Sequence, residues 1–128
     1  MRLALAAALL LALPAAAQDG RALFEQRCAS CHAVAAGAEE MAGPNLHGVL
    51  GRRVGGDPGF DYSPALQAAG RAGERWDTAR LIRFLDDPEE MYPGVWMGAN
   101  GLPAAAERRA VVEFLRGGRE GALPVAQP

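Results

Sequence analysis

The sequence predicts a small all-α protein. Three observations predict this class: apolar side chains recur at helical spacing in several segments, residues that cap helices precede these segments, and no strand-helix-strand pattern is present. The chain is also rich in residues that interrupt helices, with 16 glycines and nine prolines among 128 residues. We therefore expect short helices joined by irregular segments.

The first 17 residues have the pattern of a cleaved signal peptide. Arg2 supplies one positive charge, residues 3–13 form an apolar run of Leu and Ala, and small residues at 14–17 fit a cleavage site. The run is shorter than the roughly 20 residues that a bilayer-spanning helix needs. We expect export to the periplasm or an equivalent compartment, one domain over residues 18–118, and an unstructured tail over residues 119–128.

Residues 19–28 are expected to form the first helix. Asp19 is suited to cap its N-terminus, and Leu23, Phe24 and Cys28 share one face. Phe24 is expected to pack against a later helix.

Two thiols and an imidazole follow within five residues, at Cys28, Cys31 and His32. This C-x-x-C-H spacing is the attachment signature of a c-type haem. The thiols form thioethers with the two vinyl groups, and the histidine supplies one iron ligand. The helix at residues 19–28 would deliver the first thiol to the macrocycle.

Three other uses of the two thiols remain open. A structural zinc ion needs four ligands, but the only other histidine, His47, lies apart from the motif and there is no second thiol pair. A thioredoxin-like redox pair belongs at a helix start after a strand, a context that this sequence lacks. A plain disulfide is the simplest alternative. The spacing favours covalent haem over all three.

Two irregular segments come next, at residues 33–42 and 43–52. Pro44 keeps a free carbonyl, which is a suitable acceptor for the ring N–H of a ligating histidine. Such a bond would fix the tautomer of His32. His47 is the rival iron ligand, although a single histidine outside the motif is more often a loop residue.

Two helices are predicted in the middle of the chain. Ser63 and Pro64 form a cap and first-position pair for a helix that ends at Gly70. Asp77 caps a second helix over residues 77–86. The apolar face of that second helix consists of Leu81, Ile82, Phe84 and Leu85; its wet face carries Arg80 and Arg83, and Pro88 is expected to end it.

Residues 89–98 are too broken by Pro and Gly for a helix and too apolar for a solvent loop. We expect them to cover something flat and apolar. Met91 and Met97 could each offer a sulfur to iron, whereas a single methionine more often fills a gap in a core. The last helix is predicted over residues 103–116, with Pro103 at its start.

The charge balance excludes one class of partner. Residues 18–128 contain no lysine, twelve arginines and fifteen acidic residues, for a formal balance of −3. This balance argues against nucleic acid.

The order of these features resembles the class I cytochromes c, the soluble electron carriers with one haem. Gly20 and Phe24 precede the motif, and the chain then reads C-A-S-C-H, G-P-N-L-H-G-V-L-G-R, F-D-Y-S-P-A-L, a Trp before the third helix, P-G-V-W-M and a terminal apolar-aromatic helix. The resemblance implies a small cytochrome c fold, in which helices and loops wrap round one covalently attached haem (heme c). It implies an electron carrier that is not an enzyme.

The resemblance also implies the residues of the site. Cys28 and Cys31 would hold the haem, and His32 and Met97 would be its axial ligands. Met97 is favoured over Met91 because it ends the P-G-x-x-M motif. Pro44 would bind the ligating histidine. The positions that match those around the haem propionates are Arg52, Tyr62 and Trp76; for Tyr62 and Trp76 the residues alone also allow core aromatics bonded to backbone.

Three positions depart from the usual pattern of the family. Phe84, Val95 and Leu66 stand where many relatives carry Tyr, a hydroxyl-bearing residue and Asn. The methionine side of the iron is therefore expected to be drier and less hydrogen-bonded, and the redox potential to be changed.

The expected partners are redox proteins, with membrane contact only through a partner. Well-studied relatives surround the haem edge with lysines, whereas this chain has Glu89, Glu90 and Trp96. We therefore expect a partner whose docking face is neutral or basic, or an apolar contact through Trp96. Two other functions stay open: an electron-accepting subunit of a periplasmic dehydrogenase, and a ligand-binding or peroxidase-like haem protein.

Overall fold

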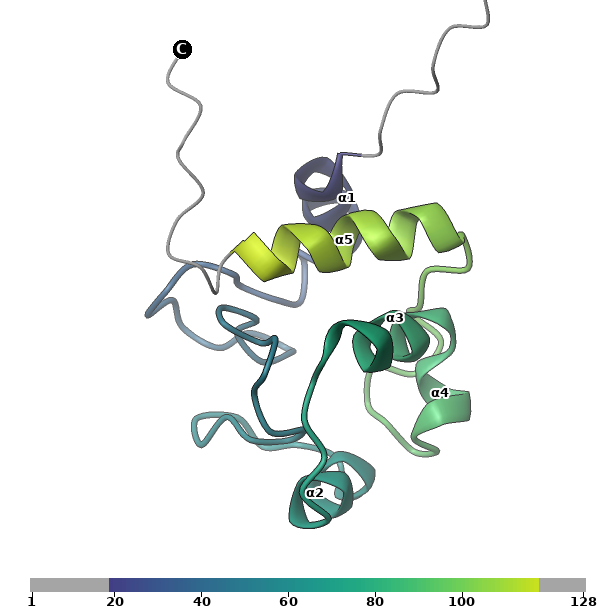
Figure 1. Ribbon diagram of the computed structural model, residues 1–128. Helices are drawn as coiled ribbons and strands as arrows, with labels where there is room; N and C mark the ends of the chain where they lie inside the picture. Colours follow the sequence, from purple (N-terminus) through teal and green to yellow (C-terminus); the bar gives the residue numbers. More distant parts are fainter. Residues whose placement is uncertain (1–18, 118–128) are drawn as a thin grey trace, which may run out of the picture.

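Five α-helices make up the regular structure of residues 19–117, the part of the chain that the computed structural model describes (Figure 1). They are α1 (Gly20–Arg27), α2 (Pro64–Arg71), α3 (Thr78–Asp86), α4 (Pro88–Met91) and α5 (Ala105–Gly117). The only β-type pairing within this range is an isolated bridge between Arg53 and Arg75. The all-α prediction is confirmed. The predicted signal peptide at 1–17 and tail at 119–128 lie outside the described residues.

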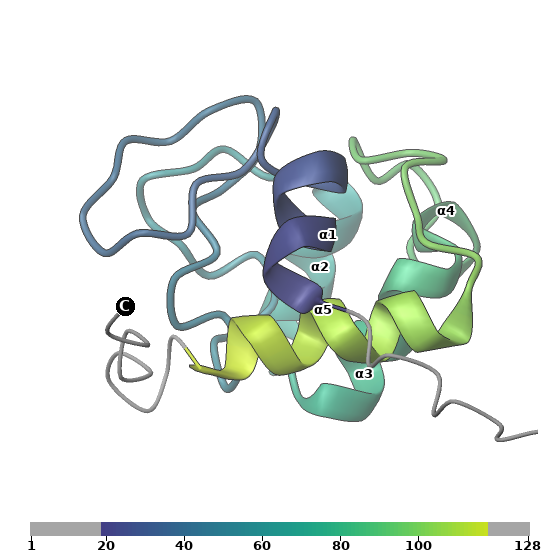
Figure 2. The same ribbon diagram turned by 90° about the horizontal axis from the view of Figure 1, so that it is seen from above.

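Helix α1 lies across α5, as Figures 1 and 2 show from two directions. The carboxylate of Asp19 caps α1 by accepting from the backbone N–H of Arg21 at 3.0 Å. At the crossing, the Phe24 and Phe114 rings lie 5.4 Å apart between centroids, so Phe24 does pack against a later helix. A Cβ atom on Gly20 would lie 2.1 Å from the backbone oxygen of Ala110.

Substituting Gly20 by alanine is therefore expected to destabilise the protein. The added methyl would meet a backbone carbonyl that cannot rotate away, and overpacking of this kind costs about 1–3 kcal/mol. Gly59→Ala is the matched control, because its Cβ would find its nearest neighbour at an ordinary 3.4 Å. Denaturant unfolding of both variants measures the difference. Equal stabilities would show that α1 and α5 can separate at no cost.

Helix α2 begins as predicted at Ser63 and Pro64, and it continues to Arg71, one residue beyond the predicted end. The chain after α2 runs back beside the segment that precedes it. The N–H of Val54 donates to the carbonyl of Glu74 at 2.9 Å, and the N–H of Trp76 donates to the carbonyl of Arg52 at 2.9 Å. This pairing places Arg52 next to Trp76, although 24 positions separate them in the sequence.

Helix α3 confirms the helix predicted over residues 77–86. Asp77 caps it, with its Oδ1 accepting from the backbone N–H of Arg80 at 2.7 Å. The predicted wet face of α3 holds only in part. Arg83 is exposed as expected, but Arg80 is only partly exposed and bonds to Glu74 and Tyr92.

Residues 88–91 overturn another prediction, because they form the short helix α4. Asp87 ends α3 and at the same time caps α4, accepting from the N–H of Glu90 at 3.0 Å. Pro88 occupies the first turn of α4, where its missing N–H is not needed. The pair Asp87-Pro88 thus ends α3 and also begins α4, whereas the prediction gave it only the role of ending a helix.

Helix α5 starts at Ala105, two residues after the predicted Pro103. The backbone N–H of Arg108 donates to the carbonyl of Ala104 at 3.1 Å, and the Arg108 side chain binds the Pro103 carbonyl at 2.7 Å. The buried side of α5 carries Val111, Val112 and Leu115. Among residues 19–117, no helix is long and apolar enough to cross a membrane.

Candidate functional site

A cavity of about 510 Å³ lies inside the described part of the chain. Its volume falls within the roughly 300–1,000 Å³ typical of ligand and cofactor sites. Helices α1, α2, α3 and α5 contribute to its lining, together with the segments that join them. Its apolar walls include Leu46, Val49, Leu66, Leu81, Phe84, Leu85, Val95, Leu102, Val111 and Leu115.

All eight predicted site residues line this one cavity: Cys28, Cys31, His32, Pro44, Arg52, Tyr62, Trp76 and Met97. The rival ligands do not. His47 is exposed, with its Nδ1 3.3 Å from the backbone oxygen of Val34, and Met91 is not a lining residue. The structure therefore brings together residues that are spread over almost 70 positions of the sequence.

The two thiols lie on a turn that continues α1. The backbone N–H groups of Cys31 and His32 both donate to the carbonyl of Cys28, at 3.0 and 2.9 Å. No disulfide joins the cysteines; Cys28 is half-buried and Cys31 is exposed. Burial raises the pKa of the Cys28 thiol. Both sulfurs are therefore free to bond to a group inside the cavity.

The His32 ring is held from two sides. Its Nδ1 lies 2.8 Å from the carbonyl oxygen of Pro44, which can only accept, so Nδ1 carries the proton and Nε2 has a free lone pair. Gly43 lies against the ring, because a Cβ atom there would be 2.3 Å from the Cε1 of His32. Burial lowers the pKa of this imidazole, although the bond to Pro44 partly opposes the shift. His32 is therefore in the neutral form that coordinates metals.

Arg52 is fixed by backbone groups. Its Nη1 donates to the carbonyl of Asn45 at 2.9 Å, and its Nη2 donates to the carbonyl of His47.

The Tyr62 hydroxyl accepts from the N–H of Asp57 at 3.3 Å, and burial raises the pKa of this phenol. Trp76 is buried, with its ring centroid 5.0 Å from that of Phe84. The cavity lining thus includes the guanidinium of Arg52 and the phenol of Tyr62 in addition to its apolar walls.

Met97 belongs to the segment that follows α4. Met97 is half-buried; of the two residues before it, Val95 is buried and Trp96 is 61% exposed. The carbonyl of Met97 accepts from the Asn100 side-chain amide at 2.7 Å. Phe84, Val95 and Leu66, the three departures noted in the sequence, all line the cavity with hydrocarbon.

Two residues of the site were missed by sequence reasoning. Gly43 has no side chain, and this leaves room for the His32 ring. Asn45 is buried and holds the preceding loop, because its Nδ2 donates to the carbonyls of Ala35 and Ala38 at 2.8 and 3.1 Å. The run G-P-N contained both, but nothing local shows which ring or loop they contact.

Within residues 19–117, no group of three or more His, Cys, Asp or Glu side chains is placed to hold a metal ion. The zinc alternative therefore has no support from the described residues. The remaining arrangement is an apolar cavity with two free thiols, one imidazole and one thioether on its lining. These residues fit a haem attached by two thioethers.

Comparisons with known proteins decide the family. A family model described as cytochrome c matches residues 17–118. The chain belongs to the cytochrome c family. It is 38% identical over 96 residues to cytochrome c2 of Agrobacterium tumefaciens, covering 75% of this chain and 86% of the relative. It is 37% identical over 100 residues to cytochrome c of Stellaria longipes, covering 78% and 90%.

A solved structure agrees with these relatives. The fold is similar to that of cytochrome c2 from Rhodospirillum centenum, with a TM-score of 0.69 and 35% identity over 76% of this chain and 92% of the other. The class I resemblance and the small cytochrome c fold are confirmed. As a cytochrome c, the protein carries one covalently attached c-type haem, and it is an electron carrier that acts with redox partners rather than an enzyme.

Proposed function

We propose that this cytochrome is a six-coordinate, single-electron carrier with His32 and Met97 as its axial ligands. One observation carries the proposal: a single apolar cavity is lined by both thiols of the motif, by the His32 ring and by Met97. The haem supplies one-electron exchange between ferrous and ferric iron. The thiols of Cys28 and Cys31 would hold it by thioethers, and the Pro44 carbonyl would keep Nε2 of His32 aimed at the iron.

Three further residues are assigned to the propionates. Arg52 would offset the cost of burying a propionate charge, and Tyr62 and Trp76 would offer an O–H and an N–H to its oxygens. Their presence on the cavity lining supports this assignment. The hydrocarbon of Phe84, Val95 and Leu66 would exclude water from the iron and leave the methionine sulfur with fewer hydrogen bonds than in many relatives.

Spectroscopy of the purified holoprotein tests the ligand set. The ferric form is expected to show the near-infrared charge-transfer band of an iron–methionine bond, the ferrous form to bind CO slowly, and redox titration to follow one electron. Haem should stay with the chain after denaturation, because thioethers survive it. A missing near-infrared band with rapid CO binding would overturn Met97 ligation and indicate a ligand-binding or peroxidase-like protein instead.

We infer that the protein works in the periplasm or an equivalent compartment, as residues 18–118 after removal of residues 1–17, with residues 119–128 as a tail. The family match at residues 17–118 supports this division, since it starts where the signal peptide is expected to end. Mass spectrometry of the exported protein should find Gln18 or Asp19 at the N-terminus. A mature chain that kept residues 3–13 would contradict the inference.

The docking face for redox partners is inferred around Trp96, Glu89 and Glu90. Trp96 is both exposed and part of the cavity lining, so a partner that covers it comes close to the haem. Both glutamates are exposed in the first turn of α4, where they add negative charge. Arg27, at the end of α1, lines the cavity and carries a positive charge, opposite in sign to the charges of the two glutamates. A partner with a neutral or basic face would fit this surface best.

Charge reversal tests the docking face. With a basic-faced redox protein, electron exchange is expected to slow as salt rises, because screening weakens the attraction. Glu90→Lys should slow that exchange by roughly threefold to tenfold at low ionic strength. Glu39→Lys, an equal charge change in the loop before Pro44, is the control and should have little effect. Fast, salt-weakened exchange with an acidic-faced oxidase would contradict the inference.

A further inference from the structure

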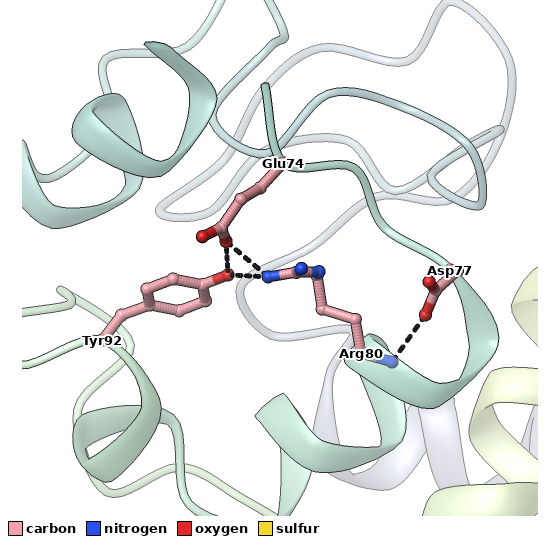
Figure 3. Close-up of polar contacts among 4 residues, drawn as sticks. All are labelled: Glu74, Asp77, Arg80 and Tyr92. Atoms are coloured by element: carbon pink, nitrogen blue, oxygen red, sulfur yellow. Dashed lines mark hydrogen bonds and ion pairs between the residues drawn. The ribbon is translucent and has the colours of Figure 1, made fainter. Parts of the chain in front are cut away.

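Three polar side chains meet outside the cavity, and they come from three different segments (Figure 3). The Tyr92 hydroxyl donates to Oε2 of Glu74 at 2.5 Å. Nη1 of Arg80 donates to the same phenolic oxygen at 2.9 Å and also to Oε2 of Glu74. Each member of this cluster therefore bonds to both of the others. We call Glu74, Arg80 and Tyr92 the phenol cluster.

Two members of the phenol cluster are held by the body of the fold. The backbone N–H of Glu74 donates to the carbonyl of Ala69 in α2 at 3.1 Å, and its carbonyl accepts from Val54. Arg80 lies in the first turn of α3, where its N–H is bound by Asp77. Glu74 and Arg80 thus form a fixed receptor for a hydroxyl group.

The third member, Tyr92, lies at the start of the segment that carries Met97. Its ring is buried and packs beside Trp76 and Phe84, with centroids 6.2 and 6.0 Å apart. Burial raises the pKa of the Tyr92 phenol, so the hydroxyl keeps its proton and remains a donor at neutral pH. The phenol cluster therefore attaches the beginning of this segment to α3 and to the chain before it.

The segment itself, residues 93–101, has mostly local bonds. In the described structure four of its backbone N–H groups have hydrogen-bond partners, and these partners lie within the segment or at Tyr92 or Glu89. Val95 bonds to Tyr92 at 3.0 Å, Gly98 to Val95 at 3.1 Å, Asn100 to Met97 at 3.3 Å, and Gly94 to the Glu89 side chain at 2.9 Å. Bonds like these can stay intact while the segment moves as a unit.

The far end of the segment has its own attachment. The N–H of Leu102 donates to the carbonyl of Leu85 in α3 at 2.6 Å, and the side chain of Arg108 binds the Leu102 carbonyl at 2.7 Å. The segment is thus tied at both ends and locally bonded between them. Segments of this kind open at a lower free energy than the core.

We propose that the phenol cluster is a positioning device that keeps residues 93–101 closed and thereby keeps Met97 on the iron. This inference rests on the proposed His32 and Met97 ligation. Losing the hydroxyl of Tyr92 leaves the Arg80–Glu74 ion pair and the packing of the Tyr92 ring intact but removes the polar attachment at the start of the segment. The open state, in which the sixth iron position is accessible, then becomes more populated.

Tyr92→Phe removes the hydroxyl and keeps the ring packing, so it is the test variant. Its ferrous holoprotein is expected to bind CO roughly fivefold to tenfold faster than the wild type, since the loss of a hydrogen bond of ordinary net strength that is broken only on opening changes the open fraction by about this factor. Its ferric form should keep the near-infrared iron–methionine band at neutral pH, because the closed state still dominates.

Thr78→Val is the matched control. The Thr78 hydroxyl also lies on α3 and also bonds to an arginine, accepting from Nη2 of Arg116 at 2.7 Å, but this bond ties α3 to α5 and not to residues 93–101. Thr78→Val is expected to lower the denaturant midpoint and to leave the CO rate within about twofold of the wild type.

The outcomes separate the two proposals. If the wild type has the near-infrared band but Tyr92→Phe binds CO no faster than Thr78→Val, the positioning role is wrong and Met97 ligation stands. If the wild type lacks the band, both proposals fail. Should Tyr92→Phe not assemble, Glu74→Gln provides the second test, because it keeps the side-chain size and removes the charge; it should raise the CO rate in the same direction by a smaller factor.

Discussion

Met97→Ala is expected to convert the carrier into a CO-binding protein. With the thioether removed, no segment has to open before CO reaches the ferrous iron. If the open state of the wild type is populated at about 0.1–10%, the CO association rate should rise roughly 10- to 1,000-fold. The reduction potential should fall, because a methionine ligand raises the potential of a c-type haem. Stopped-flow mixing with CO and redox titration measure the two effects.

Met91→Leu is the control for this change. Met91 ends α4 and does not line the cavity, so its replacement by a side chain of similar volume should alter neither the CO rate nor the near-infrared band. If Met91→Leu abolished the band and Met97→Ala preserved it, the two methionines would have to exchange roles. The segment after α4 would then differ from the arrangement in Figures 1 and 2.

The features of this fold that depend on residues close together in the sequence were predictable. Asp19, Ser63 and Asp77 each cap a helix through a bond to an N–H two or three residues ahead, and the residue pattern contains all that this interaction needs. The C-x-x-C-H motif is local in the same sense. Helix α4 was missed although its signal was local, because Asp87-Pro88 can both end one helix and begin another.

Some contacts between distant segments followed from the sequence, such as the bond of His32 to Pro44 and the packing of Phe24 on α5, but others did not. Arg80 has the spacing of a solvent-facing residue in α3, yet its partners lie six positions before it and 12 positions after it. The pairing of Glu74 with Tyr92 spans 18 positions. Only the folded chain places these groups together, since the turn after α2 and the turn after α4 approach the same side of α3. The burial of Asn45 and the contact of Gly43 with His32 have the same origin.

Gly43→Ala is expected to have the second large effect, on the histidine side of the iron. The backbone of Gly43 is fixed by the bond from its N–H to the carbonyl of Cys31 at 2.8 Å. A methyl group there would lie 2.3 Å from the Cε1 of His32, so the imidazole has to turn away. Turning breaks the 2.8 Å bond to Pro44 and moves Nε2 from the position proposed for the iron ligand. Loss of the hydrogen bond that orients a metal-ligating histidine typically lowers metal affinity or activity roughly 10- to 100-fold.

The measurement is the fraction of exported chains that carry haem with an intact low-spin spectrum, which should fall well below that of the wild type. Pro44→Ala separates the ring contact from the hydrogen bond, because alanine retains the carbonyl that His32 uses and lacks only the pyrrolidine ring. Pro44→Ala should assemble almost normally. The contrary result is that Gly43→Ala also assembles with an unchanged spectrum. The His32 ring would then not lie where an alanine Cβ comes within 2.3 Å of its Cε1, and the proposed orientation of the ligand would be wrong.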